Sequence, residues 1–346
     1  MAFLWFELLI FPGFVFVIIL TLLSEQINSR LYNRLSYNTD TNPIFIPIVE
    51  HFKLVFKGEK EKVSLKSIVQ IIMLILMVAL PLLGSLVLPI NLYETLPSIA
   101  GRYGDFRGTE TGIVGVLTFE GDILLLLGLI LLFGVLTFLI QYLERNNTTQ
   151  DSVKSVTKFM LLDIPLIAAL AGPILTKKSL CLALIAEDIR RIVQFNPVFG
   201  FVLLLPLATS ISIFSFALKF NQPYFDKVKS QKDPILNPPT KMNGKYQLWN
   251  LSMRLMEFLI GGIIISICLG GAYLPIPFMY EYRLLSTTGN FIFKTILVLM
   301  LGTIIRAAIP RLKTNQTFNI SIKVLTSLGL FSVLLIGGYI GLLGLN

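Results

Sequence analysis

Histidine and cysteine are scarce in this sequence of 346 residues, which has one histidine, His51, and two cysteines, Cys181 and Cys268. A single imidazole does not make a metal site, and two cysteines cannot supply the four ligands of an iron–sulfur cluster. Both cysteines stand in apolar surroundings without a C-x-x-C pair, so we expect them to be small buried side chains. Walker, Rossmann and nucleophile-triad motifs are also absent. The sequence therefore predicts no catalytic or metal-binding residues and no enzyme activity for this chain alone.

Charge is the second scarcity, because only 14% of the residues are charged whereas 54% are hydrophobic and the mean hydropathy is +0.77. Runs of about 20 apolar residues cross a bilayer as helices. We predict an all-α, polytopic membrane protein with a single transmembrane domain, residues 1–346, and about eight spans. The first run lacks a basic start and a cleavage site, so it is not a removable signal peptide. The predicted spans are Phe3–Leu23, Ser67–Ile90, Ile123–Leu143, Val156–Thr176, Asn196–Phe216, Leu248–Gly271, Phe291–Ile309 and Ser321–Leu343.

The net charge of +9 is distributed unevenly between the connections. Most Lys and Arg residues lie in every second connection, beginning with the one between the first two spans. By the positive-inside rule these connections face the cytoplasm, which puts both termini outside a cell inner (cytoplasmic) membrane. The positive charge thus indicates topology and a lipid bilayer as partner, and no nucleic acid.

Two cytoplasmic segments have distinct compositions. Residues 43–59 place apolar side chains at helical spacing and Glu50, Lys53 and Lys57 on another face, which predicts an amphipathic helix on the membrane surface. An ordinary linker helix resting on lipid has the same pattern. Residues 217–247 are rich in Pro, Asn and Lys, which is typical of a docking or chamber-lining loop.

Carboxylates within the apolar runs are the candidate functional groups. Asp163 and Glu257 stand inside predicted spans, where a carboxylate must pair, face the protein interior or take up a proton. They are suited to a proton relay, but a static ion pair fits them too, and Arg254 can pair with Glu257 at i, i+3. Glu120 and Asp122 precede a span, either as a hydrated helix start or as the outer mouth of a proton path.

Several blocks in order along the chain resemble subunit 1 of complex I and its counterparts in membrane-bound hydrogenases and sulfur reductases. The most specific is Arg306-Ala307-x-x-Pro310-Arg311, followed by Asn315-Gln316 and Lys323. The amphipathic segment resembles another family block through Pro47, Glu50, Lys53, Leu54, Lys57 and Glu59. Further matches are Lys154, Leu162-Asp163, Asn221, Phe225-Asp226, Leu255-Met256-Glu257-Phe258 and Leu269-Gly270-Gly271.

Two departures from the family pattern bear on the electron acceptor. Lys219 and Gln222 stand where the family has Glu and Arg, and further carboxylates expected after Asp226 are missing, which counts against quinone binding. Phe119-Glu120-Gly121-Asp122 instead resembles the branch with energy-converting hydrogenases and sulfur reductases.

The resemblance implies a subunit that connects a peripheral electron-transfer arm to an ion-pumping arm and couples redox chemistry to proton or sodium translocation. It implies no cofactor in this chain, iron–sulfur clusters in partner subunits, and two kinds of partner, peripheral iron–sulfur and hydrogenase-like subunits and antiporter-like membrane subunits. The alternatives are a quinone-binding subunit of an NADH- or deazaflavin-type oxidoreductase and a stand-alone ion-coupled transporter. Asp163, Glu257, Glu120 and Asp122 would form the ion pathway. The chamber and peripheral-arm interface would comprise Pro47, Glu50, Lys53, Lys57, Glu59, Lys154, Lys219, Gln222, Asp226, Arg306 and Arg311.

Overall fold

The structure is a computed structural model of the whole chain. The structure describes residues 9–10, 13–35, 65–92, 113–114, 117–144, 157, 159–176, 179–195, 207–220, 244–272, 283–309 and 314–343. The predicted amphipathic helix at 43–59 and most of the predicted loop at 217–247 lie outside these residues.

The described residues form helices together with one pair of two-residue strands. Six segments are long and apolar enough to cross a membrane, and two shorter apolar helices account for the remaining predicted spans. The all-α, polytopic fold is therefore confirmed. The helices are α2 (Phe14–Leu35), α4 (Leu65–Ser85), α6 (Asp122–Glu144), α8 (Asp163–Ile174), α9 (Leu182–Phe195), α11 (Ser210–Phe220), α12 (Gly244–Cys268), α13 (Arg283–Ala308), α14 (Thr314–Phe318), the π-helical η3 (Asn319–Thr326) and α15 (Ser327–Leu343). Strands β1 (Asn91–Leu92) and β2 (Ile113–Val114) pair antiparallel.

Several helix boundaries differ from the prediction; α13, for example, begins at Arg283, eight residues before the predicted Phe291. Hydropathy ends the first span at Leu23, but α2 continues to Leu35, because the polar side chains of Ser24, Gln26 and Asn28 are buried within the protein. The predicted loop 217–247 is helical at both ends, where α11 runs to Phe220 and α12 begins at Gly244.

Helix α9 lies in a segment that the sequence analysis assigns to a connection, so this helix is not predicted. It is amphipathic: Leu182, Ile185 and Ile189 recur at spacings of three and four residues and are fully buried. Such a helix is too short and too polar to register as a span, although its period of 3.6 residues is visible in the sequence.

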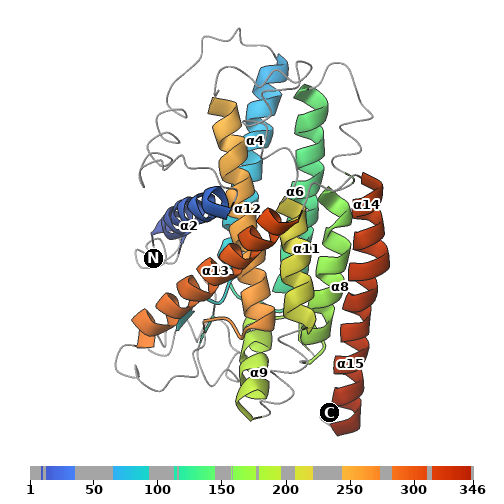
Figure 1. Cartoon of the computed structure of the whole chain (residues 1–346). Helices are drawn as coiled ribbons and strands as arrows, with labels where there is room; N and C mark the ends of the chain where they lie inside the picture. Colours follow the sequence, from blue (N-terminus) through green and yellow to red (C-terminus); the bar gives the residue numbers. More distant parts are fainter. Residues whose placement is uncertain are drawn as a thin grey trace.

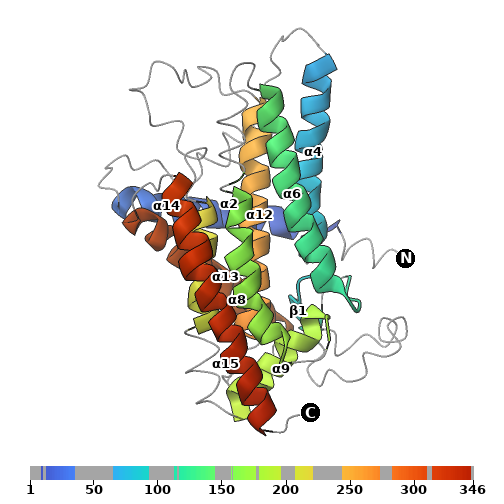
Figure 2. The ribbon, with the colours of Figure 1, turned by 90° about the vertical axis from the view of Figure 1, so that its right-hand side faces the viewer.

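The long helices fall into two sets of directions. Helices α4, α6, α8, α11, α12 and α15 run roughly along the long axis of the molecule, whereas α2 and α13 cross them obliquely (Figure 1). A view turned by 90° shows α12 behind α6 and α8, with α9 near its carboxyl end (Figure 2). Helix α12 contacts α2, α4, α8, α9, α11 and α13, so it is the central element of the fold.

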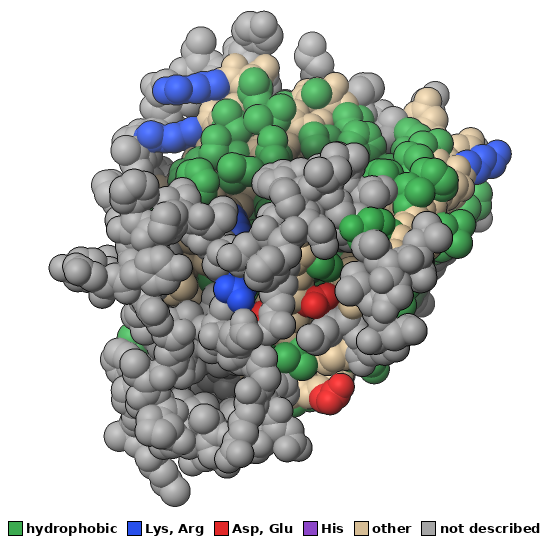
Figure 3. All heavy atoms as spheres, turned by 90° about the horizontal axis from the view of Figure 1, so that it is seen from below, with side chains coloured by type: hydrophobic (Ala, Val, Ile, Leu, Met, Phe, Trp, Pro, Cys, Tyr) green, Lys and Arg blue, Asp and Glu red, His purple; other side chains and the backbone are tan. Residues whose placement is uncertain are grey.

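The core lies around α12, whose side chains are almost all buried, among them Phe258, Leu259 and Ile264. Large apolar side chains on α4, α6, α13 and α15 are exposed instead, as expected where helices face lipid. Seen from below, hydrophobic side chains gather over the outer surfaces of the described helices, with few charged groups among them (Figure 3).

The carboxyl end of α12 is closed by two glycines and by α13. Gly270 and Gly271 have φ of 66° and 61°, and the Gly271 amide donates to the Ile265 carbonyl at 3.0 Å, which is a glycine helix cap. Lys294 of α13 donates to the carbonyls of Leu269 and Gly271 at 2.8 and 2.9 Å. A cation at the carboxyl end of a helix also interacts favourably with the helix dipole.

We predict that Gly262→Leu destabilises the fold, because the segment that follows α4 approaches α12 at this glycine. A Cβ atom at residue 262 would lie 2.6 Å from Leu88 Cδ1, and Leu88 is itself buried. Overpacking of this kind typically costs about 1–3 kcal/mol. The measurement is the melting temperature in mild detergent. Gly128→Leu is the matched control, because no atom lies within 4 Å of a Cβ there, and equal melting temperatures would contradict the prediction.

Candidate functional site

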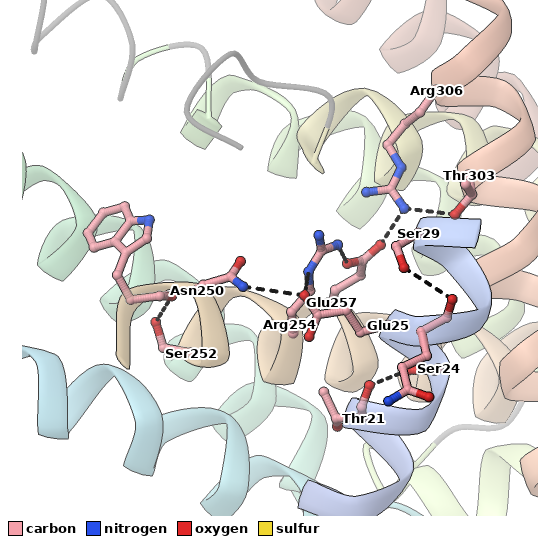
Figure 4. A network of polar contacts seen from close by, with 12 residues as sticks. Thr21, Ser24, Glu25, Ser29, Asn250, Ser252, Arg254, Glu257, Thr303 and Arg306 are labelled. Atoms are coloured by element: carbon pink, nitrogen blue, oxygen red, sulfur yellow. Dashed lines mark hydrogen bonds and ion pairs between the residues drawn. The ribbon is translucent and has the colours of Figure 1, made fainter. Parts of the chain in front are cut away.

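Four charged side chains from three helices form a network in which Glu257 is buried and the other three are partly buried (Figure 4). Arg306 Nη2 of α13 donates to Glu257 Oε1 of α12 at 2.7 Å, and Arg254 Nη1 donates to Glu257 Oε2 at 2.8 Å. Arg254 Nε also donates to Glu25 Oε1 of α2 at 3.2 Å. We call Glu25, Arg254, Glu257 and Arg306 the charge network. Its two carboxylates and two guanidinium groups give it no net charge.

The network arises from the local sequence of each helix. Arg254 and Glu257 are three residues apart and therefore share one face of α12, as the sequence predicted. The polar extension of α2 brings Glu25 to that face, where Asn250 Nδ2 also donates to Glu25 Oε1 at 3.3 Å. Near the end of α13, Arg306 donates to Thr303 Oγ1 at 2.9 Å, which fixes the direction of the guanidinium.

Apart from the charge network, a second group of charges, an ion pair, joins α8 to α11. Lys219 Nζ donates to Asp163 Oδ1, and the two side chains are 0% and 2% exposed. The ammonium group also lies 4.3 Å from the centroid of the Phe159 ring, a cation–π contact. Asp163 Oδ2 is buried, and within the described part of the chain it has no hydrogen-bond partner. Asp163 is thus in an ion pair, which the sequence left open as the alternative to a relay.

Asp163 and Lys219 both lie at helix ends where the helix dipole stabilises their charge. Asp163 is in the first turn of α8, where the helix dipole stabilises a negative charge, and Lys219 is in the last turn of α11, where it stabilises a positive one. Both charges are therefore supported by backbone dipoles as well as by each other. The place of Lys219 in the chamber, which the family resemblance implies, stays a prediction, and the structure adds its ion pair with Asp163.

Asp122 and Glu120 differ in their exposure to solvent. Asp122 is in the first turn of α6, as a helix start requires, but it is fully buried and therefore not hydrated. Its Oδ1 accepts the amide hydrogen of Leu182 at 2.8 Å, so it caps the start of α9. Glu120 is exposed and accepts a hydrogen bond from Ser179 Oγ at 3.4 Å. Burial, together with the nearby Asp122 and Glu120, raises the pKa of the Cys181 thiol to about 11, so this cysteine is a neutral packing group.

The structure brings together part of the predicted set. Glu257 meets Arg306, and Asp163 meets Lys219. Glu25 was not predicted as a site residue, although its position at the polar end of an apolar run was visible in the sequence. Within the described ranges, no group of three or more His, Cys, Asp or Glu side chains could hold a metal ion. The predicted site residues outside those ranges are Pro47, Glu50, Lys53, Lys57, Glu59, Lys154, Gln222, Asp226 and Arg311.

The fold and the paired charges within it define a polytopic membrane protein with buried ion pairs between its helices. The sequence model of one family, described as NADH dehydrogenase, matches residues 5–337. The chain therefore belongs to the NADH dehydrogenase family, which confirms the resemblance to subunit 1 of complex I drawn from its sequence blocks.

One solved structure has the same fold over nearly the whole chain. It is a chain of the membrane-bound sulfane sulfur reductase, an archaeal respiratory membrane complex, with 16% sequence identity and a TM-score of 0.67. The match covers 93% of this chain and 96% of that chain. A comparison with curated proteins gave no match.

We predict that Arg306→Met lowers the free energy of unfolding by about 3 kcal/mol, since it leaves the buried charge network with one excess negative charge. The double variant Arg306→Met/Glu257→Gln restores neutrality, because Glu25 and Arg254 still pair, and it should recover most of that loss. The readout is the melting temperature in mild detergent. Arg34→Met, at an exposed position of α2, controls for loss of an arginine. A double variant less stable than Arg306→Met would contradict the neutrality argument.

Proposed function

We propose that the protein is the membrane subunit that connects the peripheral electron-transfer arm of a complex I-related oxidoreductase to its ion-pumping arm. In this role it couples redox chemistry to proton or sodium translocation. The family and the fold shared with a chain of a sulfane sulfur reductase support this function. The Glu120-Gly121-Asp122 block and the basic Lys219 favour a hydrogenase or sulfur reductase over a quinone reductase.

One observation carries the proposal: Asp163 and Glu257, the buried carboxylates within predicted spans, are each paired with a basic residue at the end of a helix that leads into a connection. Lys219 is one residue before the end of α11, and Arg306 is two residues before the end of α13. Both connections are basic and are cytoplasmic under the proposed topology, with both termini outside. A peripheral subunit that moves either connection would therefore move the cation beside Asp163 or Glu257.

The coupling step follows from the low dielectric around these pairs. A buried carboxylate that loses its cation is strongly disfavoured as an anion and takes up a proton, which it releases when the cation returns. Redox chemistry at the cytoplasmic face would drive this exchange, and Asp163 and Glu257 would pass ions to the neighbouring membrane subunit. The unpartnered Asp163 Oδ2 is an available proton acceptor within the described part of the chain.

The proposed partners are iron–sulfur subunits of a peripheral arm and antiporter-like membrane subunits. We expect the tagged chain, extracted from its native membrane in mild detergent, to copurify with both. Mass spectrometry identifies the subunits, and assays for iron, nickel and quinone identify the redox class. Nickel would indicate a hydrogenase, and iron without nickel or quinone a sulfur reductase. Recovery of the chain alone and free of iron would overturn the proposal in favour of a transporter.

We predict that Asp163→Asn lowers ion translocation at least about tenfold while the complex stays assembled, because asparagine accepts a hydrogen bond from Lys219 but cannot carry the proton. The complex is reconstituted in proteoliposomes, and ion uptake is measured per electron transferred, with separate probes for H⁺ and Na⁺. Asp188→Asn on α9 is the matched carboxylate control. Intact translocation in Asp163→Asn, at normal assembly, would refute the role of Asp163.

A further inference from the structure

The last membrane-spanning segment has a polar face on the surface of the chain. Asn319, Lys323 and Ser327 are exposed and follow one another at intervals of four residues through η3 into α15. We call them the polar face. Among the described residues, the Lys323 ammonium makes no hydrogen bond, ion pair or ring contact. Exposed apolar side chains flank this face, including Val324 and Leu328.

The hydrocarbon of a bilayer offers no partners for the polar side chains of this face. The candidate span runs from Gln316 to Tyr339. Lys323 therefore lies about two helical turns from the start of the span, and Ser327 lies about one turn deeper. A cation that faces hydrocarbon is strongly disfavoured unless it pairs or reaches the headgroups. Lys323 could extend toward the headgroups, but the short Ser327 side chain could not. The polar face extends over about two turns, or about 12 Å along the helix axis, so its three side chains are better matched by a neighbouring helix than by one headgroup.

The opposite side of the same segment contacts the surroundings of the Asp163–Lys219 pair. Ser321 Oγ donates to the Leu161 carbonyl at 3.0 Å. Leu325 packs in one cluster with Leu162 and Leu218, the residues that precede Asp163 and Lys219. Both sides belong to η3, which is a π-helix, a geometry that occurs often at functional sites.

We propose that the polar face binds a transmembrane helix of a partner membrane subunit, and that this helix has an Asp or Glu side chain opposite Lys323. This inference rests on the proposed function, which supplies the partner subunits. Charge complementarity selects a carboxylate for Lys323, and Asn319 and Ser327 provide hydrogen bonds on either side of it. Through Ser321 and Leu325, the bound helix is one layer of side chains away from the Asp163–Lys219 pair.

The test combines a cross-link with a charge exchange in the intact complex. A photoreactive amino acid is placed at position 323 and, as the control, at Ile75, which is 57% exposed on α4. The cross-linked peptide is identified by mass spectrometry. We expect position 323 to capture a membrane-spanning peptide with an Asp or Glu side chain, and position 75 not to capture that peptide.

Charge exchange then tests the pairing itself. Lys323→Glu should reduce copurification of the captured subunit by at least about tenfold, because it sets two like charges against each other, and changing the partner carboxylate to Lys should restore it. Lys323→Arg keeps the charge and should keep the subunit bound. Cross-links to lipid alone, or a complex that keeps the subunit in Lys323→Glu, would overturn this inference but leave the proposed function standing. A wild-type chain that purifies without partners would overturn both.

Discussion

Neutralisation of charge in a medium of low dielectric is the constraint on which the rest of this structure depends. Glu25, Arg254, Glu257 and Arg306 join α2, α12 and α13, and Asp163 and Lys219 join α8 to α11. Each group is neutral as a whole, and removal of Arg306 or Lys219 leaves a buried carboxylate without one of its cations. The two groups therefore fix how five helices are placed, and they are also the positions where a change of charge has the largest effect.

Close packing around α12 holds these charges in place. Gly262 lets Leu88, in the segment after α4, approach closely, and Gly270 and Gly271 end the helix where Lys294 and α9 cover it. Since helices in a membrane gain little from burial of apolar surface against one another, contact at small residues and polar bonds between helices must supply the stability. A rigid central helix with its partners paired at one end is suited to transmit a small displacement.

The two proposals place the Asp163–Lys219 pair between two partners. Lys219 precedes the connection from α11, where a peripheral subunit would act, and η3 separates the pair from Lys323, where a membrane subunit would bind. The pair thus has one neighbour on the redox side and one on the pumping side. Coupling in this arrangement requires no cofactor in the chain, only a cation whose distance from a carboxylate changes.

Much of the site could be predicted because some contacts are local. Arg254 and Glu257 are three residues apart on one helix, so their pairing follows from helical periodicity. Asp163 and Glu257 could be singled out because a carboxylate in an apolar run needs an explanation. Glu25 was missed because its partners are more than 200 residues away, and α9 was missed because a short amphipathic helix is less apolar than a span.

The sequence by itself determined the membrane class, the family and the approximate position of each span, since hydropathy and short motifs are properties of consecutive residues. Only the tertiary structure decided which charges meet. Lys219 looked like a loop residue, and it became the partner of Asp163 because α11 extends to Phe220 and packs against α8. Ion pairing depends on distance in space, and the packing of distant helices sets that distance.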